Sequence, residues 1–449
     1  MVGSILMILT IPILSISFLL RIAIASVFFL PLGGCHGEND SKNPPSANVA
    51  TTSEIPHSAV DFVNSIGLNT HLNYFDTIYG NFPLVERELK SVGVRHLRDG
   101  IHLQNADYNT MLYGRWIQLG NLGVRFDAVL DPRSNLGPLS NDLLNKAEIL
   151  AGHTIESFEG PNEMDLSDTA DWAANDRSYQ AQIFASARAM QGGGSIKVIG
   201  PSLAFASKSS QVGNISNEMD EGNLHPYPAG HVPSVVFPDQ VIFERGMCGD
   251  KPIVFTESGY HNAINERNDQ PGVSEAAAAK YIPRLFLENY MRGIPRTYLY
   301  EFMDEKPNPG LTDPQLHWGL IRADGSEKPA FLALKNLIGE LNDSTEPAAL
   351  QPMTWNLSAE DAQIHHLLLQ KSNGIYDLVL WQEITSYNLP SHLDIDNPAV
   401  TATLTLGQQA HTITIYQPVT GANPIRVWRD IKSVQLEIPD HPLVVEIAY

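Results

Sequence analysis

Two patterns of hydrophobic and polar positions alternate along most of the chain. Short apolar runs are followed by longer stretches in which apolar residues recur every three or four positions. Residues 65–72, "SIGLNTHL", show the first pattern. Residues 82–93, "FPLVERELKSVG", show the second and place four apolar side chains on one helix face before a glycine. The first pattern predicts a buried strand and the second an amphipathic helix.

This pair of patterns recurs close to eight times between residues 65 and 341. Further strands are expected in "VRHLRDG", "VRFDAVLD", "TIESFEGPNE", "IKVIGPSLA", "GNLHPYP", "PIVFTESGYH" and "RTYLYEFMDE". Near eight strand–helix units predict a (β/α)8 barrel over residues 61–343. Because residues 205–245 are irregular, a doubly wound open sheet remains the alternative.

The pattern changes near residue 346. Segments such as "YDLVLWQEI", "VTATLTLG", "HTITIYQPVTG" and "PLVVEIAY" alternate apolar and polar positions between turn residues. This period of two predicts an antiparallel β-sandwich over residues 344–449, which we expect to pack against the barrel.

The N-terminal segment has the composition of a targeting signal. Residues 1–34 hold no Asp, Glu or Lys, and Arg21 precedes the apolar run "IAIASVFFLPLGGC". "LGGC" resembles the bacterial lipobox, so we expect residues 1–35 to be a signal peptide of lipoprotein type, with Cys35 lipidated. An ordinary signal peptide or an uncleaved anchor is the alternative. Residues 36–60 are expected to be a polar tether, and the protein to be secreted or held in the bacterial cell envelope.

Charge and cysteine content narrow the classes of partner. The 29 Lys and Arg against 50 Asp and Glu give a formal charge of −21, which argues against a nucleic acid or an anionic lipid surface as partner. Membrane contact is expected only through a lipid on Cys35. The second cysteine, Cys248, has no other partner, and HExxH, CxxC, GxGxxG, GxxxxGK[ST] and GxSxG motifs are absent from the sequence. We therefore expect neither a metal nor a cofactor.

Polar residues collect at the carboxyl ends of the predicted strands, which face the active site in a barrel of this type. Two of them are glutamates on different strands, surrounded by Asn, Arg, His and Tyr, and glycoside hydrolysis uses such a carboxylate pair. The residues are His71, Arg98, Asn162, Glu163, His225, Tyr227 and Glu257.

The strand ends "GPNE" and "FTESG" resemble the signature of clan A retaining glycoside hydrolases. The resemblance implies that Glu163 is the acid/base at the end of strand 4 and that Glu257 is the nucleophile at the end of strand 7. "HWGLIRADGSEKPAFLALKNL" also resembles the last strand and helix of these enzymes, and the whole pattern is similar to family 39, which includes β-xylosidases and exopolysaccharide hydrolases. Two departures are Met164, where proline is common, and an eighth strand without tryptophan.

The neighbours of the two glutamates suggest supporting roles. Asn162 is expected to bind the 2-hydroxyl of the sugar, and Arg98 to lower the pKa of Glu257. Tyr227 would orient Glu257, and His225 would tune the acid/base or bind sugar hydroxyls. The structural alternatives are that Arg98 pairs with Asp99 and that His225 is an ordinary loop histidine.

Aromatic residues near the strand ends are candidates for a platform under the sugar. Trp318, Phe302 and Tyr260 are the candidates, with packing as the alternative for Trp318. His71 would either line a subsite or serve the structure.

The other carboxylates around "GPNE" are expected to have structural positions. Glu156 lies at the start of the strand and should be solvated. Glu159 should point into the barrel and need an arginine such as Arg98 to offset its burial. Asp165 starts the following loop and should be structural.

Together these features predict a retaining β-glycoside hydrolase that acts by double displacement on a poly- or oligosaccharide, of exopolysaccharide or of xylan or glucan type. Its carboxyl groups should then lie about 5–5.5 Å apart. A transglycosylase that uses the same residues and a catalytically silent glycan-binding envelope protein are the alternatives.

Overall fold

The computed structural model describes residues 52–134, 136–167, 169–190, 195–236, 239–267, 269–359 and 363–449, which belong to one compact unit, Val49–Tyr449. The expected signal peptide and Cys35 lie outside the described residues. Within the described residues, no helix combines the length and the apolar character needed to cross a membrane.

Eight parallel strands form a ring. The first of them, β3 (Ile66–Asn69), pairs with β4 (His96–Gly100) on one side and with the last, β10 (Thr297–Leu299), on the other. The intervening strands follow in chain order: β5 (Arg125–Val129), β6 (Ile155–Glu159), β7 (Lys197–Ile199), β8 (Gly222–Leu224) and β9 (Ile253–Ser258). Between β7 and β8 the described pairing is the bridge Ile199–Glu221. The barrel is confirmed, and the doubly wound sheet is excluded because β3 pairs with β10.

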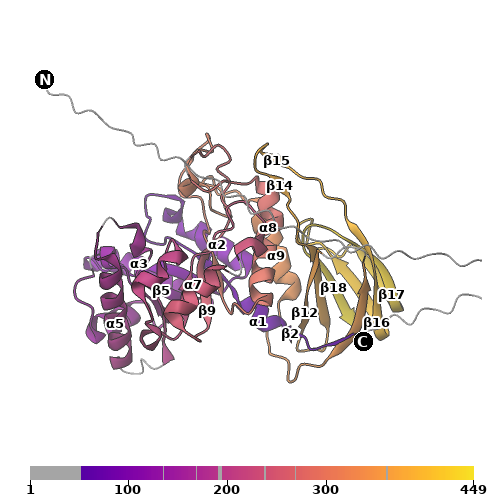
Figure 1. The fold of residues 1–449 in the computed structure, drawn as a ribbon, viewed down its shortest axis with the longest axis horizontal. Coiled ribbons are helices and arrows are strands. Elements are labelled where there is room, and N and C mark those ends of the chain that lie inside the picture. The colour runs from indigo at the N-terminus through magenta and orange to yellow at the C-terminus, as the bar shows by residue number, and fades with distance from the viewer. Residues whose placement is uncertain are drawn as a thin grey trace, which may run out of the picture. The chain divides into compact units, whose positions relative to one another are not determined.

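Helices follow the strands around the ring (Figure 1). They are α2 (Phe82–Val92), α3 (Ala106–Gly120), α4 (Asn141–Leu150), α5 (Trp172–Ala189), α6 (Ser209–Val212), α7 (Asp239–Cys248), α8 (Glu275–Met291) and α9 (Pro329–Leu341), while α1 (Ala59–Asn64) precedes the first strand. Helix α2 illustrates why the sequence forms a helix and ends it at a given residue. It buries Val85, Leu89 and Val92, and it stops at Gly93, whose φ of 82° favours glycine.

The outside of the barrel is apolar and its inside is polar. Outward residues such as Leu68, Leu97 and Phe126 are fully buried in the main hydrophobic core. Inside, Glu159 on β6 contacts Arg98 on β4 and Thr256 on β9, three strands away. Charges buried in a polar interior of this kind must be paired. The polar interior continues to the carboxyl ends of the strands.

The C-terminal domain is antiparallel. Its main strands are β11 (Met353–Ser358), β12 (Ile364–Gln370), β13 (Tyr376–Gln382), β16 (Val400–Tyr416), β17 (Arg426–Ile438) and β18 (Leu443–Ala448), with a small pair, β14 (Tyr387–Asn388) and β15 (Leu393–Asp394). The long β16 pairs with β11 in its first half and with β18 in its second. Side chains of β11 and β13, which are not neighbours in the sheet, share one core, so the sheet folds over itself as the sandwich prediction requires.

The expected tether ends earlier than predicted. Residues 36–51 lie outside the described part, but β1 (Thr52–Glu54) pairs with β11 and β2 (His57–Ser58) pairs with β12. The prediction of a tether up to residue 60 is therefore wrong for these residues. The sequence shows no apolar pattern here because β1 and β2 are edge strands, held by backbone hydrogen bonds. Their side chains are mostly exposed or half-buried.

The barrel and the C-terminal domain share a buried contact. Arg284 of α8 is fully buried, and its Nε lies 2.8 Å from Glu383 Oε2, just after β13. Trp381 Nε1 donates to Glu288 Oε1 of α8 at 3.0 Å. Helices α8 and α9 accordingly lie on the side of the barrel that faces the β domain in Figure 1. The expected packing is confirmed.

Candidate active site

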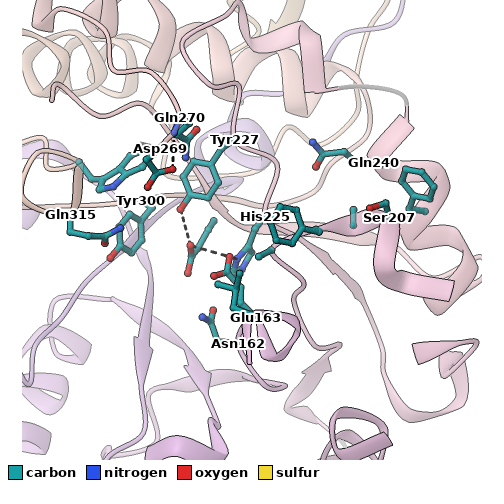
Figure 2. Close-up of a pocket in the computed structure, with 17 residues that line it drawn as sticks. Asn162, Glu163, Ser207, His225, Tyr227, Gln240, Asp269, Gln270, Tyr300 and Gln315 are labelled. Carbon is teal, nitrogen blue, oxygen red and sulfur yellow. Dashed lines mark hydrogen bonds and ion pairs between the residues drawn. The ribbon is translucent and has the colours of Figure 1, made fainter. Parts of the chain in front are cut away.

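A cleft of about 710 Å³ opens at the carboxyl ends of the barrel strands (Figure 2). Both predicted glutamates line it, Glu163 after β6 and Glu257 at the end of β9. Its lining also includes Asn162, His225, Tyr227 and Trp318 of the predicted residues, and Tyr300, which the sequence analysis missed. Arg98 and His71 lie behind this surface.

Glu257 is held by fixed donors on both oxygens. Its Oε1 accepts from Arg98 Nη1 at 2.6 Å, and its Oε2 accepts from the hydroxyl of Tyr227 at 2.7 Å. The predicted contacts of Glu257 with Arg98 and Tyr227 are thus confirmed. The carboxylate is oriented by a cation on one side and a phenol on the other.

Arg98 uses all five of its N–H donors. Two bind Glu159, at 2.7 Å each, and the others bind Asn69 Oδ1, Asn162 Oδ1 and Glu257. Burial opposes its charge, but Glu159 and Glu257 raise the pKa of Arg98 well above its ordinary value. The inward position of Glu159 is confirmed.

The alternative pairing of Arg98 with Asp99 is wrong. Asp99 accepts instead from the hydroxyl of Thr70 at 2.8 Å and from the backbone N–H groups of Leu72 and Gly100. Burial raises the pKa of Asp99 to about 7.

Glu163 follows β6 in the left-handed region, with φ 48° and ψ 47°, at the start of the 3-10 helix η3 (Met164–Leu166). This conformation is costly for a residue with a Cβ and is typical of functional positions. The backbone N–H of Glu163 donates to Ser202 O at 3.0 Å, which fixes the turn. About one fifth of the Glu163 side chain is exposed, at the cleft.

His225 joins the two glutamates. Its Nδ1 lies 2.8 Å from Glu163 Oε1 and 3.5 Å from Glu257 Oε2, and its Nε2 lies 2.9 Å from Thr256 Oγ1. Since Thr256 donates its own hydroxyl hydrogen to Asn223 Oδ1 at 2.7 Å, Oγ1 is free to accept from Nε2–H. Both ring nitrogens therefore have acceptors, which suits an imidazolium.

The charges around His225 agree with this assignment. Burial by itself would lower the pKa of His225, but Glu257 and Glu163 raise it above its ordinary value. Burial by itself would raise the pKa of Glu163, but the hydrogen bond and charge of His225 lower it. These opposite directions favour a proton on His225 over a proton on Glu163. The prediction that His225 tunes this carboxyl has a direct geometric basis.

The two carboxylates are close. One oxygen of Glu163 and one of Glu257 lie within 4.8 Å of each other, with His225 Nδ1 equally near. This distance is a close approach of single oxygens, whereas the carboxyl groups themselves are about 5–5.5 Å apart in retaining enzymes and about 6.5–9.5 Å apart in inverting ones. A cation bound by these three residues would compete with the proton on His225 Nδ1 and with the hydroxyl of Tyr227, which donates to Glu257 Oε2, the oxygen near His225. His71, Glu301 and Glu305 form another set of nearby ligand atoms in the described chain.

His71 supports the cleft from behind. Its Nε2 lies 3.3 Å from the hydroxyl of Tyr300 and 3.4 Å from Glu301 Oε2, and its ring stacks on Tyr74 with centroids 4.5 Å apart. Burial lowers the pKa of His71 to about 4, so the ring is neutral at pH 7. His71 was predicted either to line a subsite or to serve the structure. It contacts Tyr300, which lines the cleft, and so lies directly behind the cleft surface.

Five aromatic side chains line the cleft, and three of them, Tyr227, Tyr300 and Trp318, lie together. Trp318 packs against Tyr227, with ring centroids 5.0 Å apart, and against Tyr300, at 5.9 Å. Its indole Nε1 is buried and has no hydrogen-bond partner among the described residues. Phe302 and Tyr260 are wrong as platform candidates, because both are buried outside the lining. Alternation in "YLYEF" could have identified Tyr300, since Tyr298 also points into the barrel, where Gly67 leaves room for its ring.

Two other carboxylates around "GPNE", Glu156 and Asp165, are held by specific contacts. The expectation of a solvated Glu156 is wrong, because it lies 2.7 Å from His96 Nδ1, 2.9 Å from Arg296 Nη1 and 3.3 Å from the hydroxyl of Tyr298. Despite burial, these contacts lower the pKa of Glu156 to about 2. Asp165 accepts from two backbone N–H groups of the loop after β7, so its predicted structural role is confirmed.

Among comparisons with known proteins, those with solved structures identify the fold. No protein-family model matches the sequence, and no curated protein matches it. Among solved structures, a monomeric β-xylosidase from Caulobacter crescentus CB15 matches with a TM-score of 0.57 at 14% identity, over 88% of this chain and 97% of that one. The GH39 enzyme from Xanthomonas axonopodis pv. citri matches with a TM-score of 0.57 at 13% identity, over 88% and 96%.

A glucosidase from Croceicoccus marinus matches with a TM-score of 0.50 at 9% identity, over 81% of this chain and 91% of that one. At such identities the similarity establishes the architecture. The chain therefore has the fold of these glycoside hydrolases, as the resemblance to clan A and family 39 implied.

Proposed function

We propose that the protein is a retaining β-glycoside hydrolase acting on an oligo- or polysaccharide. The observation that carries this proposal is the position of Glu163 and Glu257, at the ends of β6 and β9, where one oxygen of each lies within 4.8 Å of the other. Only Glu257 is held by Arg98 and Tyr227, so the two carboxylates have different environments and different roles. The fold shared with a β-xylosidase supports the same reaction class.

In the first step, Glu257 attacks the anomeric carbon and the glycosidic C–O bond breaks. The leaving oxygen takes a proton from Glu163, which receives it from His225 across the 2.8 Å hydrogen bond. Once Glu257 is esterified its negative charge is lost, and this charge is a main reason why the pKa of His225 is raised. The second step runs in reverse: Glu163 takes a proton from water, the oxygen of the water attacks the anomeric carbon, and Glu257 is released.

The surrounding groups would position the sugar. Asn162 binds Arg98 through Oδ1, so its amide N–H₂ is the group it offers to a sugar hydroxyl. The buried Nε1–H of Trp318 would donate to a second hydroxyl. Hydrogen bonds of this kind strengthen as charge develops on the sugar in the transition state.

The test is a screen of aryl β-glycosides and polysaccharides with wild type, Glu257→Gln and Glu163→Gln, with the first product anomer followed by proton NMR. We expect cleavage with retention, and losses of at least about 10³-fold in kcat for Glu257→Gln. Cleavage that persists in Glu257→Gln would overturn the proposal. Transfer to an added acceptor sugar in place of water would identify a transglycosylase with the same residues.

A further inference from the structure

One wall of the cleft is apolar and exposed. Leu166, Phe205 and Phe243 are 55%, 53% and 40% exposed, and all three line the cleft. They come from three separate elements: η3, the residue before the 3-10 helix η5 (Ala206–Lys208), and α7. Exposed apolar side chains are ordinary when scattered, but their convergence on one cleft marks a binding surface.

This wall is built in advance of any ligand. The buried carboxylate of Asp165, on η3, accepts from the backbone N–H groups of Ala204 at 2.9 Å and Phe205 at 3.1 Å. The ammonium of Lys208 donates to Asp165 O at 2.7 Å and lies 4.7 Å from the centre of the Phe205 ring. The loop that carries Phe205 is therefore tied to the helix that carries Leu166.

The wall lies on the side of the acid/base. Leu166 belongs to the same short helix that Glu163 begins. In Figure 2, Ser207 and Gln240 lie to one side of Glu163 and His225, whereas Tyr300 and Gln315 lie to the other. Because the acid/base protonates the oxygen of the leaving group, the part of the cleft next to Glu163 receives the aglycone.

The polar groups on this wall suit a sugar. Ser207 offers a hydroxyl and Gln240 an amide, which donate and accept hydrogen bonds to sugar hydroxyls. Aromatic and aliphatic side chains cover the C–H face of a pyranose ring in the same way as other apolar surfaces. We propose that Leu166, Phe205, Phe243, Ser207 and Gln240 form an aglycone site for carbohydrate, so that the leaving group is a sugar of an oligo- or polysaccharide. This inference rests on the proposed function.

The test compares two substrates that share one glycosyl unit. The sugar whose aryl β-glycoside the wild type cleaves fastest is supplied as its β-glycosyl fluoride, which has no aglycone ring, and as its β-linked trisaccharide. In Phe205→Ala and Phe243→Ala, kcat/KM for the trisaccharide should fall about three- to tenfold for each ring removed. Hydrolysis of the fluoride should stay within about twofold, which also shows that the variants fold.

The matched control is Ile242→Ala, which removes a 65% exposed side chain next to Phe243 on α7, outside the cleft lining. This variant should leave kcat/KM unchanged for both the fluoride and the trisaccharide. Unchanged trisaccharide cleavage in both Phe variants, or equal losses for fluoride and trisaccharide, would overturn the aglycone site while leaving the hydrolase intact. Failure of the wild type on every aryl β-glycoside and fluoride would instead overturn the proposed function itself.

Discussion

Arg98 is the residue on which the other site residues depend. It joins Glu159 inside the barrel to Glu257 at its mouth, and it also holds Asn69 and Asn162. A buried cation with five satisfied donors cannot be exchanged for another cation without loss, because lysine has a single ammonium in place of the planar fork. The geometry of the nucleophile and the stability of the barrel therefore share one side chain.

We expect Arg98→Ala to lower the free energy of unfolding by about 3–5 kcal/mol, since Glu159 would remain buried and unpaired. Arg98→Lys should retain more stability but still lower kcat by about tenfold or more. Urea unfolding and steady-state kinetics measure both. Lys306→Ala, whose side chain is 50% exposed in its pair with the 79% exposed Asp76, is the control and should leave the free energy of unfolding nearly unchanged. Equal effects of Arg98→Ala and Lys306→Ala would contradict the assignment.

The Glu163–His225 pair predicts the pH profile. The first step needs one proton on this pair, and Glu257 and Glu163 raise the pKa of His225, so activity should be lost as pH rises through a value above about 6.5. In His225→Asn the proton can reside only on Glu163, and the alkaline limb should move to lower pH. Profiles of kcat/KM against pH test this, and an unmoved limb in His225→Asn would exclude the shared proton.

The sequence predicts some helices and strands well and others not at all. The buried apolar runs of β3, β6 and β9 and the apolar face of α2 predicted those elements, because packing in the core leaves a periodic pattern. Strands β1 and β2 left no such pattern, since they contribute backbone hydrogen bonds at sheet edges. The strand ends predicted Glu163 and Glu257. Phe205 and Phe243 could not be placed, because Phe205 lies in an irregular loop and Phe243 on α7, a helix that the irregular pattern of residues 205–245 did not predict.

The start of β6 carries its own prediction. Glu156 contacts His96 on β4 and Tyr298 on β10, and its pKa is lowered to about 2. A carboxyl with a lowered pKa adds stability above its unfolded pKa of about 4.5, and this stability is lost as pH falls toward about 2. Glu156→Gln should therefore cost up to about 3 kcal/mol at pH 7, about half of that near pH 3 and little at pH 2. Urea unfolding at several pH values measures this, and a pH-independent difference would contradict it.

The whole molecule depends on the contact between the barrel and the β domain. Glu383 accepts from Arg284 of α8 and, at 2.9 Å, from the backbone N–H of Ser234, in the 3-10 helix η7 (Pro233–Val236) of the barrel. Strands β1 and β2, which precede the barrel, complete the β domain that follows it. The C-terminal domain is thus a structural partner of the barrel.

Glu383→Ala should destabilise the protein by about 3–5 kcal/mol, because Arg284 would stay buried without its carboxylate. Near- and far-UV circular dichroism during urea unfolding would record the loss. Glu437→Ala, on an exposed side chain of β17 that accepts from the hydroxyl of Thr401, is the control and should cost at most about 1 kcal/mol. A neutral Glu383→Ala would show that the domains are held together elsewhere.

The central claim is that Glu257 becomes covalently bound to the sugar. A 2-deoxy-2-fluoro-β-glycosyl fluoride of the preferred sugar slows the second step, so that the glycosyl-enzyme accumulates and can be digested and located by mass spectrometry. The account predicts one glycosyl unit per chain, esterified to Glu257 in the peptide that contains "FTESG". A glycosyl group on any other residue, or hydrolysis with inversion and no trapped intermediate, would contradict it.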